Sequence, residues 1–427
     1  MLSSKNLRPE EQLLVWSIAR LSDGPPPELC PARPTGRLDW KVVLSLATWH
    51  RLLPLLYHQA KHLEDFPEVP HQVLEYLGQV SQWNLTKNLV LRAHLQEVLL
   101  ALEHRQIPAL VLKGIPLEER LYPRFGTRPT SDIDVMVRRS DLPGAQEVLE
   151  SLGYESSGDE PLREAFRQYH HHLAPFMHAR TGTTVELHWH IVSPASPLRM
   201  NVDEMWDRAQ PNAVGGASSL MLAPEDQLLH LCLHFLNDRL ASRPASLLQL
   251  CDIALLLRRD GGSVRWGDFV ERTLAHSVGP AVYTALYAAK LVAGSVLPPE
   301  ASRLRPGGFD EEQARLFVIR RIVGVSDEVS ADLVRTLAVR GIRGKARVLR
   351  HIVRPPAEWT PGGDLRVALT SAPAGLRYLF RPFAGLAVIA RAIFHLPRLR
   401  DQVRVEQWLA QYPDMAGSDV EMHPGLH

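Results

Sequence analysis

The feature that most constrains this chain is a short apolar run that carries two carboxylates. Asp132 and Asp134 stand one residue apart, and the run continues through Val135 to Val137. Alternate residues of a strand point to the same side, so Asp132 and Asp134 are expected to project together while Ile133 faces a core. Like charges held side by side repel unless a cation lies between them, and carboxylate oxygens suit Mg²⁺ bound with substrate phosphates. The run therefore predicts a strand with a metal–nucleotide site on its polar face.

The composition is that of an ordinary globular protein. Of the 427 residues, 45% are hydrophobic and 22% are charged, and a net charge of +1 favours no class of partner. Three widely spaced cysteines suit neither a disulfide framework nor a zinc site, so we expect a reducing, cytoplasmic location. The first residues lack the apolar segment of a signal peptide, and no apolar run reaches about 18 residues, so no membrane-spanning helix is expected.

Apolar spacing separates helical parts of the chain from a mixed part. A period near 3.6 residues predicts helices over 9–20, 40–62, 71–105, 224–235, 247–257 and 279–292. Short apolar or alternating runs predict strands over 107–112, 132–137, 171–178 and 183–190. Capping signals predict two more helices over 116–122 and 141–152. Strand, helix, strand and helix within about 45 residues are typical of a small α/β unit.

The same patterns divide the chain into four regions. We expect a helical N-terminal region over 1–105, a core over 106–200, a helical region packed on the core over 201–295, and a basic helical C-terminal region with a flexible tail over 313–427. Proline and glycine concentrate in 293–312, which predicts a linker. The mixed core is therefore expected to be embedded in helical segments on both sides.

Further polar residues suit nucleotidyl transfer, which needs a cation on the phosphates, a base for the acceptor and donors for the triphosphate. Lys113 and Gly114 follow directly on a predicted strand, where a glycine lets backbone N–H groups approach a phosphate and the lysine adds a charge. Arg128, four residues before Asp132, offers a bidentate phosphate contact. Glu186 falls on a later strand and offers the third carboxylate that two metals about 4 Å apart require.

Two other polar positions complete the candidate set. His188 shares the strand face of Glu186 and is expected either to position the base or contact a phosphate, or to be a satisfied structural histidine. Ser131 precedes the carboxylate pair and is a candidate nucleotide contact. A zinc cluster built from His170 and His172 together with His188 and His190 is a disfavoured alternative, because zinc ligands need closer supporting order than this spacing shows.

These motifs resemble the nucleotidyltransferase superfamily with the DNA polymerase β fold, which is marked by a glycine-containing turn followed by Asp-hydrophobic-Asp. More closely, they resemble the uncharacterised nucleotidyltransferase family of bacteria, in Leu112–Gly114, Arg128, Asp132–Asp134 and Glu186–Trp189. The resemblance covers roughly residues 10–290. The wider superfamily has a Gly-Ser turn where this chain has Lys-Gly, and the closer family shares that change.

The resemblance implies an α+β fold: a small mixed-sheet nucleotidyltransferase core, like that of polymerase β, within mainly helical N- and C-terminal segments. It implies an enzyme that uses Mg²⁺, or Mn²⁺ in its place, to move a nucleoside monophosphate from an NTP co-substrate to an acceptor hydroxyl or amine. Asp132, Asp134 and Glu186 would be the catalytic metal ligands. The candidate nucleotide-binding residues are Lys113, Gly114, Arg128, Ser131 and His188.

The acceptor and the NTP base are left open, since a small molecule, a peptide or a protein would all fit such a core. From Arg335 to Arg404 there are 14 Lys and Arg against three acids. This stretch suits a nucleic acid or an anionic membrane, but a helical subdomain with a solvated basic face is favoured. The alternative function is a catalytically inactive scaffold or regulatory interaction protein that keeps the fold.

Overall fold

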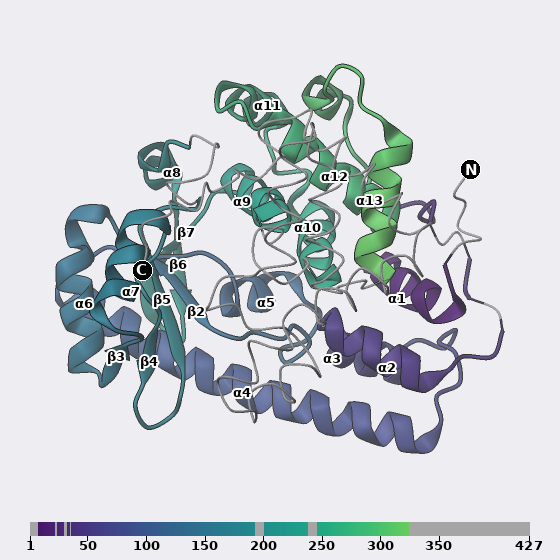
Figure 1. Ribbon diagram of the computed structural model, residues 1–427, viewed down its shortest axis with the longest axis horizontal. Coiled ribbons are helices and arrows are strands. Elements are labelled where there is room, and N and C mark those ends of the chain that lie inside the picture. Colours follow the sequence, from purple (N-terminus) through teal and green to yellow (C-terminus); the bar gives the residue numbers. More distant parts are fainter. Residues whose placement is uncertain are drawn as a thin grey trace, which may run out of the picture.

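The computed structural model describes residues 7–323 apart from 22–23, 30–31, 35, 193–199 and 238–245. A mixed sheet with helices around it forms one half, and a helical part packs beside it (Figure 1). The expected basic C-terminal helices, from residue 324 onward, lie outside the described residues. Within the described part, no helix has both the length and the apolar character that crossing a membrane requires.

One mixed sheet of seven strands carries the predicted carboxylates. Its strands are β1 (Leu110–Val111), β2 (Ile133–Met136), β3 (Tyr154–Ser156), β4 (Phe176–His178), β5 (Thr184–His188), β6 (Gln210–Val214) and β7 (Ala217–Met221). Their order across the sheet is β3-β4-β5-β2-β1-β7-β6. The central strand β2 runs parallel to β5 and antiparallel to β1, and β1 runs parallel to β7. The outer pairs β3–β4, β4–β5 and β6–β7 are antiparallel.

The alternation along β2 separates two faces of the sheet, as the sequence predicts. Ile133 and Val135 point into one apolar core, while Met136 belongs to the core on the other side. Asp134 alternates with them and therefore shares the side of Met136. The register sets Asp134 opposite Glu186 on the parallel strand β5. Two carboxylates 52 positions apart in the chain are thus neighbours on one face.

Two helices cover the face that carries Ile133 and Val135. They are α4 (His71–His104) and α6 (Leu142–Ser151). Helix α4 has 34 residues and is about 50 Å long at 1.5 Å per residue. Its buried stripe follows the predicted period and consists of Leu91, Leu95, Val98, Leu99 and Leu102. Beyond the sheet, α4 continues along α3 (Leu53–His62) and so connects the two halves (Figure 1).

The helical half packs on the opposite face around a second, larger core. Its centre is α12 (Gly279–Ala293), which is buried on most of its surface against α1 (Pro9–Ala19), α9 (Pro224–Asn237) and α10 (Leu247–Asp260). The remaining helices are α2 (Trp40–Trp49), α5 (Ile115–Leu121), α7 (Glu160–Tyr169), α8 (Val202–Arg208), α11 (Trp266–Ala275) and α13 (Glu311–Val323), with 3-10 turns at Arg139–Asp141 and Pro299–Leu304. The face of the sheet with the carboxylates therefore lies toward α5, α9 and α10.

The structure differs from the sequence-based expectation at two main places. The helix expected over 40–62 is two helices, because Arg51 adopts a φ of 60° and turns the chain between α2 and α3. The sheet also continues beyond residue 200, where only helices were expected. Strands β6 and β7 have mostly exposed or half-exposed residues and so lack the apolar alternation that would have revealed them.

Candidate active site

The turn between β1 and α5 brings Lys113 and Gly114 to the edge of the carboxylate strand. Gly114 has a φ of 74°, in the left-handed region that side chains rarely adopt. A Cβ at this position would meet Cγ2 of Thr130 at 3.0 Å, so space as well as backbone conformation requires glycine. The amide of Leu112 donates to the backbone oxygen of Asp134 at 3.3 Å and holds the turn beside β2. The predicted glycine turn therefore lies next to the predicted carboxylates.

Asp134 is the centre of a buried charged cluster. Its Oδ1 lies 2.9 Å from Nζ of Lys113 and 3.0 Å from Nε2 of His188. The same nitrogen of His188 lies 3.4 Å from Oε2 of Glu186. The Asp134 side chain is 1% exposed and that of Glu186 is 21% exposed, so Asp134 forms the floor of the site and Glu186 its rim. Asp132 is half-buried at the start of β2 and accepts a hydrogen bond from Oγ of the exposed Ser131 at 3.0 Å.

Burial and charge act in opposite directions on the pKa values of Lys113 and Asp134. Burial alone would lower the pKa of Lys113, but the surrounding carboxylates outweigh it and the pKa is raised. Burial would likewise raise the pKa of Asp134, yet Lys113 and His188 hold it well below its usual range. Burial and the charge of Asp134 raise the pKa of Asp132, and the charge of Lys113 only partly opposes this. Lys113 and Asp134 therefore form an ionised pair at the floor of the site. The ionised form of Asp132 beside them would be stabilised by a further cation.

His188 links the two strands of the site. Its burial would lower its pKa, but its hydrogen bonds to Asp134 and Glu186 prevail and raise it. Only 2% of the residue is exposed. His188 therefore lies beneath the carboxylates and supports them, and its expected contact with a nucleotide stays a prediction.

The donor set fits a divalent cation. One ligand atom each from Asp134, Glu186 and His188 all lie within 4.8 Å of one another. Asp132 directly precedes β2 and is close enough for the charges of Asp134 and Glu186 to act on it. Oδ2 of Asp134 is buried and has no hydrogen-bond partner among the described residues. An unsatisfied buried carboxylate oxygen is costly, and a metal ion would satisfy it. Carboxylate oxygens are the ligands that Mg²⁺ and Mn²⁺ prefer, so these residues are suited to hold one.

The neighbouring histidines do not assemble a zinc site. The ring of His172 lies 5.0 Å from that of His188, but its Nδ1 donates to the backbone oxygen of Leu173 at 2.8 Å. Nε2 of His190 contacts the backbone oxygen of Met200 at 3.1 Å instead of joining the cluster. Among the described residues, His188 is brought together with carboxylates, so the alternative of a cluster of histidines is not supported.

A buried network fixes the loop that leads from α5 into β2. Oε1 of Glu118 accepts hydrogen bonds from the amides of Gly126 at 2.7 Å and Arg128 at 2.9 Å. Nδ2 of Asn88, on α4, donates to Oε2 of Glu118 at 2.6 Å and to the backbone oxygen of Arg128 at 2.8 Å. Burial raises the pKa of Glu118 to about 6, although these donors act to lower it. The position of Asp132 at the end of this loop is thus set by two helices.

The side chain of Arg128 has a different partner from the expected phosphate. Its Nε and Nη2 donate to the two carboxylate oxygens of Asp252 on α10, at 2.9 and 2.8 Å. Tyr122 donates its hydroxyl to the same carboxylate at 2.8 Å. The Arg128 side chain is 9% exposed, so a phosphate contact would require the pair to separate. The structure gives Arg128 the role of an anchor between the loop and the helical half, and its phosphate contact stays a prediction.

Two cations that the sequence analysis did not identify approach Asp132 from the N-terminal helical region. Arg51, in the turn between α2 and α3, donates from Nη2 to the backbone oxygen of Pro129 at 3.0 Å. Lys87 lies on α4 next to Asn88, and its Nζ lies 5.5 Å from the centroid of the Trp83 ring. Burial lowers the pKa of both cations, and the charge of Asp132 opposes this for both. Their distance from Asp132 in the sequence gives no sign of this proximity.

A comparison with known protein families is consistent with this arrangement. A family model described as an uncharacterised nucleotidyltransferase matches residues 36–294. The matched range is more than half of the 427 residues and includes all the site residues described above. Neither the curated proteins nor the solved structures contain a match to the chain.

Proposed function

Because the chain belongs to the uncharacterised nucleotidyltransferase family, we propose that it transfers a nucleoside monophosphate from an NTP to an acceptor hydroxyl or amine. The observation that carries the proposal is the pairing of Asp134 with Glu186 across two parallel strands. Lys113 lies against Asp134, and the charges of Asp134 and Glu186 act on the neighbouring Asp132, which supports the proposal. A cluster of this kind is what binding a metal–triphosphate complex requires.

Metal binding is assigned to the three carboxylates. Asp132, Asp134 and Glu186 would hold Mg²⁺ or Mn²⁺, and the unsatisfied Oδ2 of Asp134 supports this assignment. The ion would neutralise charge on the NTP phosphates. Lys113 compensates Asp134 from the side of the glycine turn, and His188 keeps the Asp134 and Glu186 carboxylates in place.

Phosphate binding is assigned to the turn and to the cations around Asp132. The backbone of Gly114 has no side chain to obstruct a phosphate, and the exposed Ser131 adds a hydroxyl. Arg128 is engaged with Asp252, so Arg51 and Lys87 are better placed to contact the triphosphate than Arg128 is. These two cations come from the N-terminal helical region, which would make that region part of the nucleotide site.

In the proposed reaction, the acceptor oxygen or nitrogen forms a bond to the α-phosphorus. The bond from that phosphorus to the oxygen bridging the α- and β-phosphates breaks, and pyrophosphate leaves. The acceptor proton passes to the Glu186 carboxylate, which is more exposed than the Asp134 carboxylate paired with it. Its position at the rim gives Glu186 access to an acceptor that enters from solvent.

The reaction is tested with NTPs labelled at either end of the triphosphate. The full chain is incubated with Mg²⁺, an extract of the source cells and each of the four NTPs, labelled at the α- or the γ-phosphate. We expect α-label in an acceptor and γ-label only in pyrophosphate. The Asp132→Asn/Asp134→Asn variant should lose at least about 100-fold of this transfer, as expected when groups that act on the transition state are removed. Asp203→Asn is the matched control, because its side chain is 84% exposed and lies outside the cluster.

Three outcomes would overturn the proposal. Incorporation of γ-label would identify a phosphoryl transferase. Transfer that persists in Asp132→Asn/Asp134→Asn would show that these two carboxylates do not take part in the reaction. No incorporation with any of the four NTPs would favour the alternative of an inactive scaffold, in which Lys113 permanently neutralises Asp134.

A further inference from the structure

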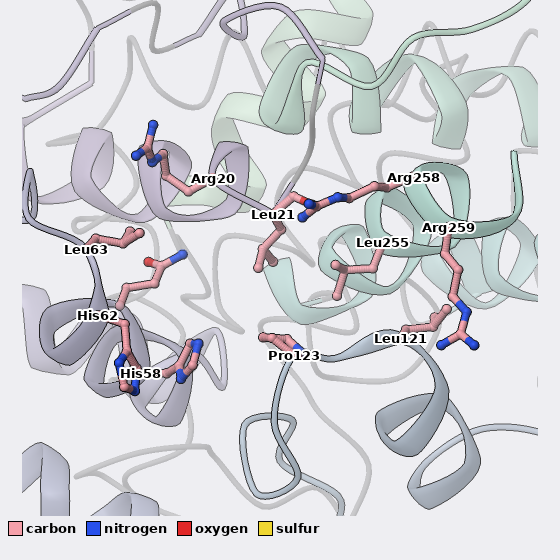
Figure 2. A pocket seen from close by; sticks show the side chains of 11 residues that line it. Arg20, Leu21, His58, His62, Leu63, Leu121, Pro123, Leu255, Arg258 and Arg259 are labelled. Atoms are coloured by element: carbon pink, nitrogen blue, oxygen red, sulfur yellow. The ribbon is translucent and has the colours of Figure 1, made fainter.

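A separate cavity of about 480 Å³ lies where the helical half meets the loop after α5. Figure 2 shows it between the ends of α1, α3 and α10. None of its lining residues belongs to the carboxylate cluster. The residues that line it are Arg20, Leu21, His58, Gln59, His62, Leu63, Leu121, Pro123, Leu255, Arg258 and Arg259.

Cationic and apolar side chains alternate around the cavity (Figure 2). Three guanidinium groups and two imidazoles line it, and none of its lining residues is acidic. Arg20 pairs with the exposed Asp65 at 3.1 Å, and Nε of Arg259 lies 4.0 Å from the buried carboxylate of Asp260. Both arginine side chains remain about half exposed, at 44% and 55%. Leucines and a proline lie between and beside these cations (Figure 2).

We propose that this cavity binds a small organic phosphate, with the phosphate at the arginines and a planar or apolar moiety against the leucines. Guanidinium groups present forked donors that match phosphate oxygens, and several of them together favour a multiply charged anion. The cavity volume is in the range of small-ligand sites and accommodates a molecule of mononucleotide size.

The histidines support an anion at this site. The rings of His58 and His62 lie 4.7 Å apart. Burial lowers the pKa of His58, and the nearby charges of His62 and Arg124 lower it further. A bound anion would oppose this shift, because it would stabilise the protonated imidazole.

The cavity is connected to the candidate active site through one residue. Leu121 and Pro123 line the cavity, and Tyr122 between them donates its hydroxyl to Asp252 at 2.8 Å. Asp252 in turn binds Arg128, which anchors the loop that leads into Asp132. A ligand in the cavity would therefore contact the segment that holds this anchor. The binding proposal itself does not depend on nucleotidyl transfer.

The test measures binding of AMP, inorganic phosphate and adenosine to the full chain by calorimetry, with EDTA present to remove metal ions. AMP should bind more tightly than phosphate, and adenosine should bind least. The Arg258→Gln/Arg259→Gln variant should weaken AMP binding at least about tenfold, as expected for the loss of charge-assisted hydrogen bonds. Since Arg258 also donates to the backbone oxygen of Leu21 at 3.2 Å, thermal unfolding checks that the variant folds.

A second variant and two controls make the result decisive. Arg20→Gln/Arg259→Gln leaves the Leu21 contact intact and should also weaken AMP binding. The Asp132→Asn/Asp134→Asn variant should bind AMP as the wild type does, and so should Arg105→Gln/Arg163→Gln, which removes two exposed arginines elsewhere. The proposal is overturned if AMP does not bind at about 1 mM, the weak end of ligand affinities. It is also overturned if binding survives both cavity variants, or is lost with the carboxylates.

Discussion

Nζ of Lys113 lies 2.9 Å from Oδ1 of Asp134, and this pair joins the glycine turn to the central strand of the sheet. The Asp134 side chain is 1% exposed and that of Lys113 is 18% exposed. The ammonium therefore compensates a carboxylate that could not be buried alone. The ammonium of Lys113 thus neutralises Oδ1 of Asp134, as a metal ion bound to that oxygen would do.

This relationship predicts that Lys113→Met is destabilised in EDTA and partly rescued by a divalent cation. Loss of one partner of a buried pair costs about 3 kcal/mol, because the remaining charge is uncompensated. Urea unfolding in EDTA and in Mg²⁺ measures both effects. The exposed Lys290 provides the control, Lys290→Met, which should respond to neither. Equal stability of Lys113→Met and wild type in EDTA would argue against the pair.

The anchor between Arg128 and Asp252 predicts a loss of folding stability when either is removed. Arg128→Met should lower the free energy of unfolding by about 3–5 kcal/mol, and Arg128→Met/Asp252→Leu should recover much of it, because no buried charge is then left unpaired. Chemical denaturation gives both values, with Arg105→Met as an exposed control. If Arg128→Met kept wild-type stability and only weakened NTP binding, Arg128 would be a phosphate contact, as the sequence suggested.

The left-handed turn at Gly114 predicts a steric cost that depends on Thr130. Gly114→Ala should be destabilised by more than the roughly 1–3 kcal/mol that a φ of 74° with a ψ of −124° costs alone, because its Cβ would meet Cγ2 of Thr130 at 3.0 Å. Gly182→Ala is matched in φ, at 67°, and its Cβ would meet nothing within 4 Å. Thr130→Ser removes the contacted methyl group, so the double variant should be more stable than the sum of the two single effects. Strict additivity would contradict the proposed contact.

The buried Glu118 predicts a specific dependence of stability on pH. Its pKa is raised to about 6 in the folded protein, so the folded state holds this proton more tightly than the unfolded state does. The contribution is complete below the unfolded pKa of about 4.3 and is lost as the pH rises through about 6, at a cost of roughly 2 kcal/mol. The stability difference between wild type and Glu118→Gln should show this step in denaturation from pH 4 to pH 7. A difference that does not change with pH, as expected for the exposed Glu103→Gln, would refute it.

The polar face of the sheet could be predicted because strand alternation is a local property. A period of two residues was enough to predict that Asp132 and Asp134 share one face of a strand. The same rule predicted that Glu186 and His188 share a face of a later strand. The structure adds the register, which sets Asp134 opposite Glu186. The buried stripe of α4 also follows directly from its period. The family match over residues 36–294 confirms the resemblance from which the fold class was inferred.

The other parts depend on contacts between distant segments. Arg128 has the sequence position of a phosphate ligand, but Asp252 lies 124 residues away and no local pattern reveals their pairing. The approach of Arg51 and Lys87 to Asp132 depends on how α4 crosses the sheet. Strands β6 and β7 take their form from pairing with each other and with β1, since their own apolar alternation is weak. Local patterns thus predicted the positions of Asp134, Glu186 and His188 on the sheet better than those of the cations that surround them.

The most direct measurement of the central claim is the stabilisation of the full chain by NTP with and without Mg²⁺. If the carboxylates bind a metal–nucleotide complex, one of the four NTPs at 100 times its Kd should add about 2.7 kcal/mol to the free energy of unfolding, and only with the metal present. Asp132→Asn/Asp134→Asn should fold and show no such gain, while Asp203→Asn should behave as wild type. Equal stabilisation of the double variant, or none of the wild type by any NTP, would contradict the account.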